Sequence, residues 1–575
     1  MAEACSIADP RPRLPATRFV VAGGLALATV ASVVHLRWGD LSAVESWDAV
    51  GRSWARFVQF LAAFGAPDVS AEALADAGRM LLETLAVALL GVGLGLLLGY
   101  PLAIGACRAI VLGDDSHRTA SRWLRRLVLE ACRLLLDVLR GVPDFAWALV
   151  LANFWGIGTP TGVLAIGVSV AGILGKVLSE QWDNQDPQRY AFLRSTGASP
   201  LQVFLYGVQP LSARAMTSFV LMRTECAIRN ASVIGVIAGS GLGIGLWDAF
   251  RDLRYDYVVT LLLAMLVLTA TADVSANFLR HQLRVDPNHP RAQRRQSVQG
   301  SVVRRGLGVA ACIAALAVLL WQQWPAFAQL GEELARLEGE FAWGYARKLL
   351  LTPDLSALGV ALEESFVPLA VALLTTLGAT LLAAALAYPA SVAFQLHAGK
   401  FTGEDPSLAR RAVRLASVVA ARGLALVFRA VPEVAWLLIL GAFFRQGLLA
   451  GVLAVTLHST GVLLRVFVET VDNTPYRRLE QVAGACRPHI FLYGALPTAW
   501  DDWRTYAFFQ FEVNMRMGIV LGMVGAGGLG EAFDGNLRYG FDRIPRACMF
   551  LWAMVALTVL VDRTSRWLQM RRLRC

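Results

Sequence analysis

One stretch of the sequence occurs twice, and this duplication constrains the fold more than any other feature. The first copy runs from Gly197 to Gly243 and the second from Gly484 to Gly530. The offset between them stays at 287 residues, as from Gly197 to Gly484, without a gap. Each copy carries an acid and a base four residues apart in an apolar segment, followed by a glycine cluster. A repeat of this length predicts two similar halves.

The composition places both halves in a membrane. Hydrophobic residues make up 56% of the 575 residues, charged residues only 17%, and the mean hydropathy is +0.52. Soluble cores do not require so large an apolar fraction. The net charge of +10 comes from arginines in short segments between apolar runs. That pattern is typical of anchoring at the cytoplasmic membrane face and does not indicate a nucleic-acid partner.

Apolar runs of about 20 residues, the length that spans a bilayer, predict an all-α polytopic membrane protein with about 12 transmembrane helices in two six-helix halves. We place the halves at residues 1–284 and 305–575, joined by a basic cytoplasmic linker at 285–304. The first run is interpreted as a retained span because no small-residue cleavage site follows it. The runs lie near 19–36, 80–107, 127–153, 158–178, 212–243, 257–279, 305–323, 365–395, 412–443, 446–468, 499–526 and 547–568.

The distribution of arginine predicts the orientation. Segment 280–305 holds seven arginines and one acid, and 563–575 holds five arginines and none, so both termini and the linker are expected in the cytoplasm. Segments 38–79 and 324–364 are richer in acids and too polar to span. They predict amphipathic helices on the outer surface, which either dock an external partner or simply pack at the interface.

A short cytoplasmic segment precedes the fifth span of each half. It reads as a short helix stopped by glycine, a second amphipathic piece, and a proline that opens the next span. Because it occurs at the same place in both halves, it predicts a pair of levers for a soluble motor. Its residues are Arg194, Gly197, Ala198 and Pro200 in the first copy, and Gly484, Ala485 and Pro488 in the second.

Two acid–base pairs, Glu225/Arg229 and Glu512/Arg516, have the favourable i,i+4 order with the acid first. Charges in a span cost a few kcal/mol, so they are expected to face an interior or an aqueous path. One interpretation is an ion pair that holds helices together. The other is a substrate pathway for an anion, because the planar arginine fork suits the oxygens of an oxyanion.

Arg140 and Arg429, each just before a Val-Pro, also have two interpretations. They either add to the field of that pathway or satisfy carbonyls freed at kinked helices. The glycine clusters are interpreted as an unwound gate near the outer face or as close helix packing. They comprise Gly239, Gly241 and Gly243 in the first half, and Gly525, Gly527, Gly528 and Gly530 in the second.

Together these motifs resemble the permease subunits of binding-protein-dependent ABC importers, most of all the phosphonate-transporter permease family. Glu512–Arg516, which includes Asn514, the glycine run Gly525–Gly530 and Arg429–Trp436 match that family's patterns. The resemblance covers about 80–280 and 365–570. It implies a type I importer fold, two ATPase subunits on the cytoplasmic side and an external substrate-binding protein.

The sequence departs from the family in places. The Glu-Ala-Ala that heads the family's coupling loop is absent, with Ala191–Leu193 and Arg478–Glu480 in its place, and Asn514 has Ala227 as its counterpart. Most members of the family are single halves that pair, whereas this chain carries both. The first half is the more diverged, so unequal motor contacts are expected.

Several chemistries have no motif in the sequence. There is no Gly-x-x-x-x-Gly-Lys-Ser/Thr loop, no His-Glu-x-x-His and no Gly-x-Ser-x-Gly. We therefore expect no cofactor or metal on this chain, with ATP and Mg bound by partner subunits.

The leading hypothesis is a permease of an ATP-driven importer for phosphonate, in a bacterial inner membrane. The alternatives are import of phosphite, phosphate or another small solute, a passive channel, and an intramembrane enzyme using Glu225 or Glu512.

Overall fold

Helices form nearly all of the chain that the structure describes. The computed structural model describes residues 27–34, 47–112, 119–283, 298–336, 339–396, 407–444, 447–473 and 487–573, and these ranges contain no β-strand. Seven of their helices are long and apolar enough to cross a membrane, and nine spans result if each of two bent helix pairs counts as one. The expected all-α polytopic membrane fold is confirmed.

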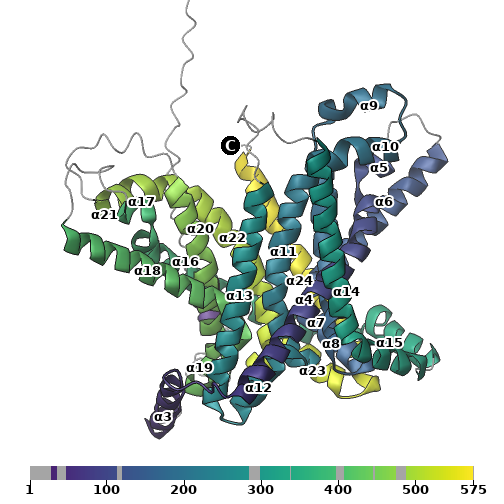
Figure 1. Cartoon of the computed structure of the whole chain (residues 1–575). Coiled ribbons are helices and arrows are strands. Elements are labelled where there is room, and N and C mark those ends of the chain that lie inside the picture. Colours follow the sequence, from purple (N-terminus) through teal and green to yellow (C-terminus); the bar gives the residue numbers. More distant parts are fainter. Residues whose placement is uncertain are drawn as a thin grey trace, which may run out of the picture.

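The first half is built around the pair α4 and α8, which pack along each other more extensively than any other two helices (Figure 1). Small residues permit this approach, because a Cβ at Gly91, Gly95 or Gly99 would meet the backbone or side chains of α8. The helices of this half are α3 (Trp47–Ala63), α4 (Ala71–Ala106), α5 (Arg108–Val111), α6 (Thr119–Gly141), α7 (Asp144–Trp155), α8 (Thr159–Asp183), α9 (Ala191–Ser195), α10 (Pro200–Val203), α11 (Gln209–Ala238), α12 (Gly241–Arg251) and α13 (Tyr255–Leu283).

The second half repeats this order, with α16 and α20 as its central pair. Its first helix, α14, crosses to the other half and packs on α4 and α8. The helices are α14 (Val298–Arg336), α15 (Gly339–Leu351), α16 (Leu358–Ala390), α17 (Val392–Gln395), α18 (Leu408–Ala430), α19 (Glu433–Phe444), α20 (Leu448–Asn473), α21 (Arg487–Ile490), α22 (Leu496–Leu521), α23 (Leu529–Arg538) and α24 (Ile544–Leu573).

Two of the predicted spans are broken helices. The run at 127–153 divides into α6 and α7 at Pro143, and the run at 412–443 divides into α18 and α19 at Pro432, with a bend of 96° in the second case. Each of these runs therefore holds two helices that meet at the kink expected beside Arg140 and Arg429. Proline has no N–H to donate and disfavours the helical conformation of the residue before it, so each helix stops and restarts there.

Two further expectations meet the structure only in part. Residues 27–34 are helical, whereas the rest of the predicted first span at 19–36 and most of the linker at 285–304 lie outside the described residues. Segment 324–364 was expected to lie wholly outside the spanning helices, which is wrong at both ends. α14 continues through Pro325 to Arg336, because the apolar residues around that proline keep the helix hydrophobic, and α16 already begins at Leu358.

The bundle has two distinct ends (Figure 1). The C-terminal end of α24 lies at the same end of the bundle as α9, α10 and α21, and we call this the loop end. The helices α3, α12, α15 and α23 lie at the opposite end, which we call the far end. The two segments predicted as amphipathic cytoplasmic levers thus share one end with the C-terminus.

The amphipathic helices at the far end bridge the two halves. α3 of the first half packs against α19 of the second as well as against α13. Conversely, Tyr345 on α15 packs against Phe154 on α7, with ring centroids 5.4 Å apart. Each half therefore covers part of the other at this end.

Candidate functional site

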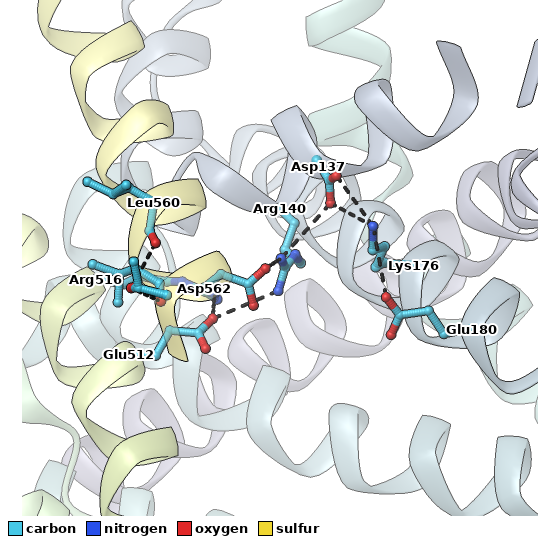
Figure 2. Close-up of polar contacts among 10 residues, drawn as sticks. Asp137, Arg140, Lys176, Glu180, Glu512, Arg516, Leu560 and Asp562 are labelled. Atoms are coloured by element: carbon cyan, nitrogen blue, oxygen red, sulfur yellow. Dashed lines mark hydrogen bonds and ion pairs between the residues drawn. The ribbon is translucent and has the colours of Figure 1, made fainter. Parts of the chain in front are cut away.

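An arginine of the first half is paired with acids of the second. Arg140 lies in the last turn of α6, just before the break at Pro143. Its Nη2 is 2.8 Å from Oδ2 of Asp562 on α24, and its Nη1 is 3.8 Å from Oε1 of Glu512 on α22. Figure 2 shows these contacts converging at the boundary between the halves.

The ion pairs continue on both sides of Arg140. Arg516 pairs with Glu512 one turn away on α22. On the other side, Asp137 lies 4.0 Å from Arg140 and 3.0 Å from Nζ of Lys176 on α8. The result, visible in Figure 2, is a chain of charges from α22 and α24 to α8. We call Arg140, Asp137, Lys176, Glu512, Arg516 and Asp562 the first cluster.

The second half presents the same arrangement to the first. Arg429, in the last turn of α18, pairs with Asp273 on α13 and lies 3.8 Å from Oε1 of Glu225 on α11. Arg229 donates to the same Glu225 oxygen at 3.0 Å. Arg465 on α20 lies 3.9 Å from Glu225 and 4.0 Å from Asp273. We call Arg429, Glu225, Arg229, Asp273 and Arg465 the second cluster.

The two clusters are related by the repeat, because each member of one has a counterpart at an offset of 287 or 289 in the other, except Asp137. Their contacts are exchanged: each half supplies an arginine to the acids of its neighbour. The pattern of contacts thus has a two-fold character that matches the predicted pair of equivalent bundles.

Burial makes these contacts important for stability. Glu225, Asp273, Arg429 and Asp562 are each exposed by 8% or less. Removing one partner from a buried charge pair typically costs 3–5 kcal/mol, because the other charge is left uncompensated. Both interpretations of the Glu/Arg pairs, as ion pairs and as part of a pathway, therefore require that each charge keeps its partner.

At each helix break, the carbonyl that the proline leaves without a backbone donor accepts a hydrogen bond from the tryptophan of the repeated Arg-x-Val-Pro-x-x-x-Trp pattern. Nε1 of Trp147 donates to the carbonyl of Leu139 at 3.3 Å, and Nε1 of Trp436 donates to that of Phe428 at 3.2 Å. The guanidinium groups are thereby left to face the opposite half.

Asn514 lies apart from the clusters. Its side chain is fully buried, accepts hydrogen bonds from Ser459 and Gln510, and donates to Thr376 at 2.9 Å. All of these partners belong to the second half. Asn514 therefore joins α16, α20 and α22 inside one half, and the described contacts give it a packing role.

The glycine clusters combine close packing with a change in chain direction. A Cβ at Gly243 or Gly530 would collide with a backbone carbonyl oxygen of the preceding long helix, that of Ser232 or Ile519 respectively. The neighbouring glycines, Gly239 and Gly241 in the first half and Gly525, Gly527 and Gly528 in the second, have positive φ. Only glycine adopts that backbone conformation readily, so the sequence permits the sharp break after α11 and α22.

The first predicted coupling segment forms an exposed apolar surface at the loop end. α9, which contains Arg194, ends before Gly197 (φ 79°), and Ser199 caps α10, which begins at Pro200. Exposed apolar side chains around this turn include Phe192, Leu201 and Tyr206. Such residues at a membrane protein's polar end indicate a surface for another subunit.

The second coupling segment is described only in part. Gly484 and Ala485 lie outside the described residues, whereas Pro488 lies in α21. Tyr493, the counterpart of Tyr206, is 80% exposed. The apolar character of the loop end is therefore repeated in the second half.

A charged hollow of about 580 Å³ lies at the far end of the first half, between the starts of α4 and α13. It is lined by Asp68, Asp76, Arg79, Arg254 and Tyr257 among others. The backbone N–H of Ser70 binds the Asp68 carboxylate and lowers its pKa. The hollow therefore presents acidic and basic side chains together at the far end of the first half.

Sequence reasoning missed five members of the clusters: Asp137, Lys176, Asp273, Arg465 and Asp562. Most of them carry a detectable signal, because Asp273/Asp562 and Lys176/Arg465 are charges in apolar runs at an offset of 289. Asp137 has no such signal, since its counterpart is Leu426. In the ranges that the structure describes, no group of three or more His, Cys, Asp or Glu side chains is arranged to hold a metal ion.

Comparison with known proteins agrees with this architecture. The family of binding-protein-dependent transport system inner membrane components matches the chain at residues 105–285 and again at 407–574. The phosphate-import permease protein PhnE of Mycolicibacterium smegmatis is 27% identical over 501 residues, which cover 86% of this chain and 85% of that protein. No solved structure matches the chain significantly.

Two shorter relatives match part of the chain. The phosphite transport system permease protein PtxC of Stutzerimonas stutzeri is 29% identical over 35% of this chain and 69% of its own length. The putative cryptic phosphonate transport system permease protein PhnE2 of Escherichia coli is 33% identical over 20% of this chain and 97% of its own length. The chain therefore belongs to the family of binding-protein-dependent transport system inner membrane components, and it carries two copies of that component fused in one polypeptide.

Proposed function

We propose that this protein is the transmembrane permease of an ATP-driven importer for phosphonate or a related phosphorus oxyanion. The observation that carries the proposal is the reciprocal pairing of arginines and acids across the boundary of two repeated bundles. Arginine forks at such a boundary suit the oxygens of a tetrahedral anion. The names of the relatives, which are permeases for phosphate, phosphite and phosphonate, support the same class of substrate.

The substrate pathway in this proposal runs between the halves. It is lined by Arg140, Arg429, Glu225, Arg229, Glu512 and Arg516. The carboxylates orient the guanidinium groups and offset their charge while no substrate is bound, which lowers the cost of holding them in a membrane. The glycine clusters after α11 and α22 act as the gate at the far end, where their packing against the preceding helices is opened and closed.

The partners are two ABC ATPase subunits and an external substrate-binding protein. The ATPases bind ATP and Mg and dock on the apolar surface of the loop end, so this end, both termini and the linker at 285–304 are cytoplasmic. The binding protein docks at the far end. The domains are 1–284 and 305–575, and the membrane is the bacterial inner membrane. The chain itself hydrolyses nothing and holds no cofactor.

Transport by reconstituted vesicles tests the proposal. The full chain, with its cognate ATPase and binding protein, is expected to accumulate at least one of phosphate, phosphite and methylphosphonate, each supplied separately as a radiolabelled or isotopically labelled anion. Uptake should require ATP and stop when the ATPase is omitted. Uptake that persists without any ATPase would contradict the proposal. Transport of none of the three anions would also contradict it.

A further inference from the structure

The two clusters are repeated in sequence but unequal in geometry. In the first, Lys176 is 13% exposed and lies 3.0 Å from Asp137. Its repeat counterpart in the second cluster, Arg465, has a side chain that is 38% exposed and lies no closer than 3.9 Å to any carboxylate among the described residues. Lys176 thus forms a close ion pair with a carboxylate. Arg465 lies near two carboxylates but forms no hydrogen bond with either of them in the described part of the chain.

Charge is also distributed unequally. The first cluster contains three cations, Arg140, Lys176 and Arg516, and three carboxylates. The second contains the three guanidinium groups of Arg229, Arg429 and Arg465 against two carboxylates. Arg429 lies within electrostatic reach of both other arginines. Mutual repulsion among three cations is relieved when an anion joins them.

Glu433, a further carboxylate near the second cluster, pairs with a histidine and not with Arg465. Glu433, at the start of α19, lies 3.2 Å from Nε2 of His458 on α20, and Nδ1 of this histidine contacts the carbonyl of Val431. Glu433 is thus paired with His458 next to the break between α18 and α19. Arg465 remains the accessible cation of the group.

Arg465 lies at the boundary between the halves. Its two nearest acids, Glu225 and Asp273, both belong to the opposite half. A guanidinium turned toward lipid would be far from these acids and would be costly in hydrocarbon. Arg465 lies eight residues before the end of α20 at Asn473, a rise of about 12 Å along the helix. Arg465 therefore lies in the half of α20 that is nearer the loop end.

We infer that Arg465, with Arg229 and Arg429, forms the site that receives the transported oxyanion on the loop-end side of the pathway. The first cluster lines the same pathway, but each of its cations is already held by a close carboxylate. Three converging guanidinium groups provide the bidentate donors that a tetrahedral phosphorus oxyanion accepts. This inference rests on the proposed function, since it places a residue on the path of the proposed substrate.

The test compares Arg465→Gln with Arg504→Gln in the complete reconstituted importer. Arg504 is a matched control because its side chain is 37% exposed and pairs with the exposed Asp501 on its own helix, α22. The R465Q variant is expected to lower maximal uptake of the transported anion at least tenfold. Its KM should stay within twofold, because the external binding protein sets the capture of substrate. The R504Q variant should retain maximal uptake within twofold.

ATP hydrolysis separates a binding role from a structural one. If Arg465 only held the halves together, R465Q would lower binding-protein-stimulated hydrolysis along with uptake, whereas loss of an anion contact leaves that hydrolysis within twofold of wild type. A conservative variant, R465K, keeps the charge but loses the fork and is expected to lower maximal uptake threefold to tenfold. If R465Q fails to assemble, the uptake and ATP hydrolysis of R465K distinguish the two roles.

Wild-type uptake by R465K and R465Q, or a parallel loss of hydrolysis and uptake, would overturn the inference while the proposed importer stood. Failure of the wild-type complex to take up phosphate, phosphite and methylphosphonate would instead contradict the proposed function.

Discussion

The pair formed by Arg140 and Asp562 allows a quantitative test of how the halves are joined. Among the described residues, Asp562→Asn removes the one carboxylate within hydrogen-bonding distance of this guanidinium and leaves those of Glu512 and Asp137 at 3.8 and 4.0 Å. Breaking a buried charge pair costs about 3–5 kcal/mol. Because two carboxylates remain near Arg140, we expect a loss in the free energy of unfolding of about 3 kcal/mol.

A double-mutant cycle isolates the interaction itself. Arg140→Met, Asp562→Asn and the double variant are compared by unfolding the full chain in mixed micelles with increasing SDS, followed by tryptophan fluorescence. Arg140→Met leaves Asp562 without its guanidinium, and the double variant removes both charges. We therefore expect a coupling energy of at least about 2 kcal/mol for this contact.

Arg422 and Asp472 provide the matched control within the chain. They are also 2.8 Å apart, but both belong to the second half and the arginine side chain is 48% exposed. Exposed pairs contribute up to about 1 kcal/mol, so the coupling of Arg422 with Asp472 should stay below that value. A coupling between Arg140 and Asp562 no larger than the control would refute the argument that buried charges join the halves.

Three further predictions concern packing and reactivity. Gly530→Ala should destabilise the chain by more than about 2 kcal/mol, because a Cβ there meets the carbonyl oxygen of Ile519, whereas Gly535→Ala, with open space around it, should be neutral or slightly stabilising in the same SDS titration. Asn514→Ala should cost about 2–3 kcal/mol by leaving its buried hydrogen-bond partners unsatisfied, while Asn536→Ala, which loses one partly buried bond to its own helix, should cost less than about 1 kcal/mol. Burial next to Asp183 raises the pKa of Cys107 to about 12, so at pH 8 only about one thiol in 10⁴ is ionised; maleimide should modify it only after unfolding, and rapid modification of the folded protein, read by mass spectrometry, would contradict this.

Much of the fold follows from patterns that the sequence displays openly. The duplication, the apolar runs and the glycine clusters predicted paired all-α halves because each depends on local spacing. The Val-Pro pairs indicated kinks at Pro143 and Pro432, but not how sharp each bend is, because hydropathy averages over the proline. The length of α14 was underestimated for a related reason, since a few polar residues do not end a helix that packs on a neighbouring half.

The site was predicted only where charges lie close together in sequence. The pair Glu512/Arg516 follows from i,i+4 spacing, but the link from Arg140 to Asp562 joins residues 422 positions apart. Such a contact depends on how two bundles meet, which hydrophobic periodicity does not encode. Asn514 is adjacent in sequence to the charged pair, yet its hydrogen bonds lie inside one half. Its position in the sequence does not show whether it contacts the other half or packs within its own.

The exchange of arginines between the halves has a consequence for how the protein is made. When the ribosome has released only the first bundle into the bilayer, Asp273 and Arg140 have not yet met the groups that offset them. These residues must stay hydrated, or be shielded by the insertion machinery, until α18 and α24 arrive. Covalent fusion guarantees that the compensating helices follow on the same chain, at the right time and in equal number.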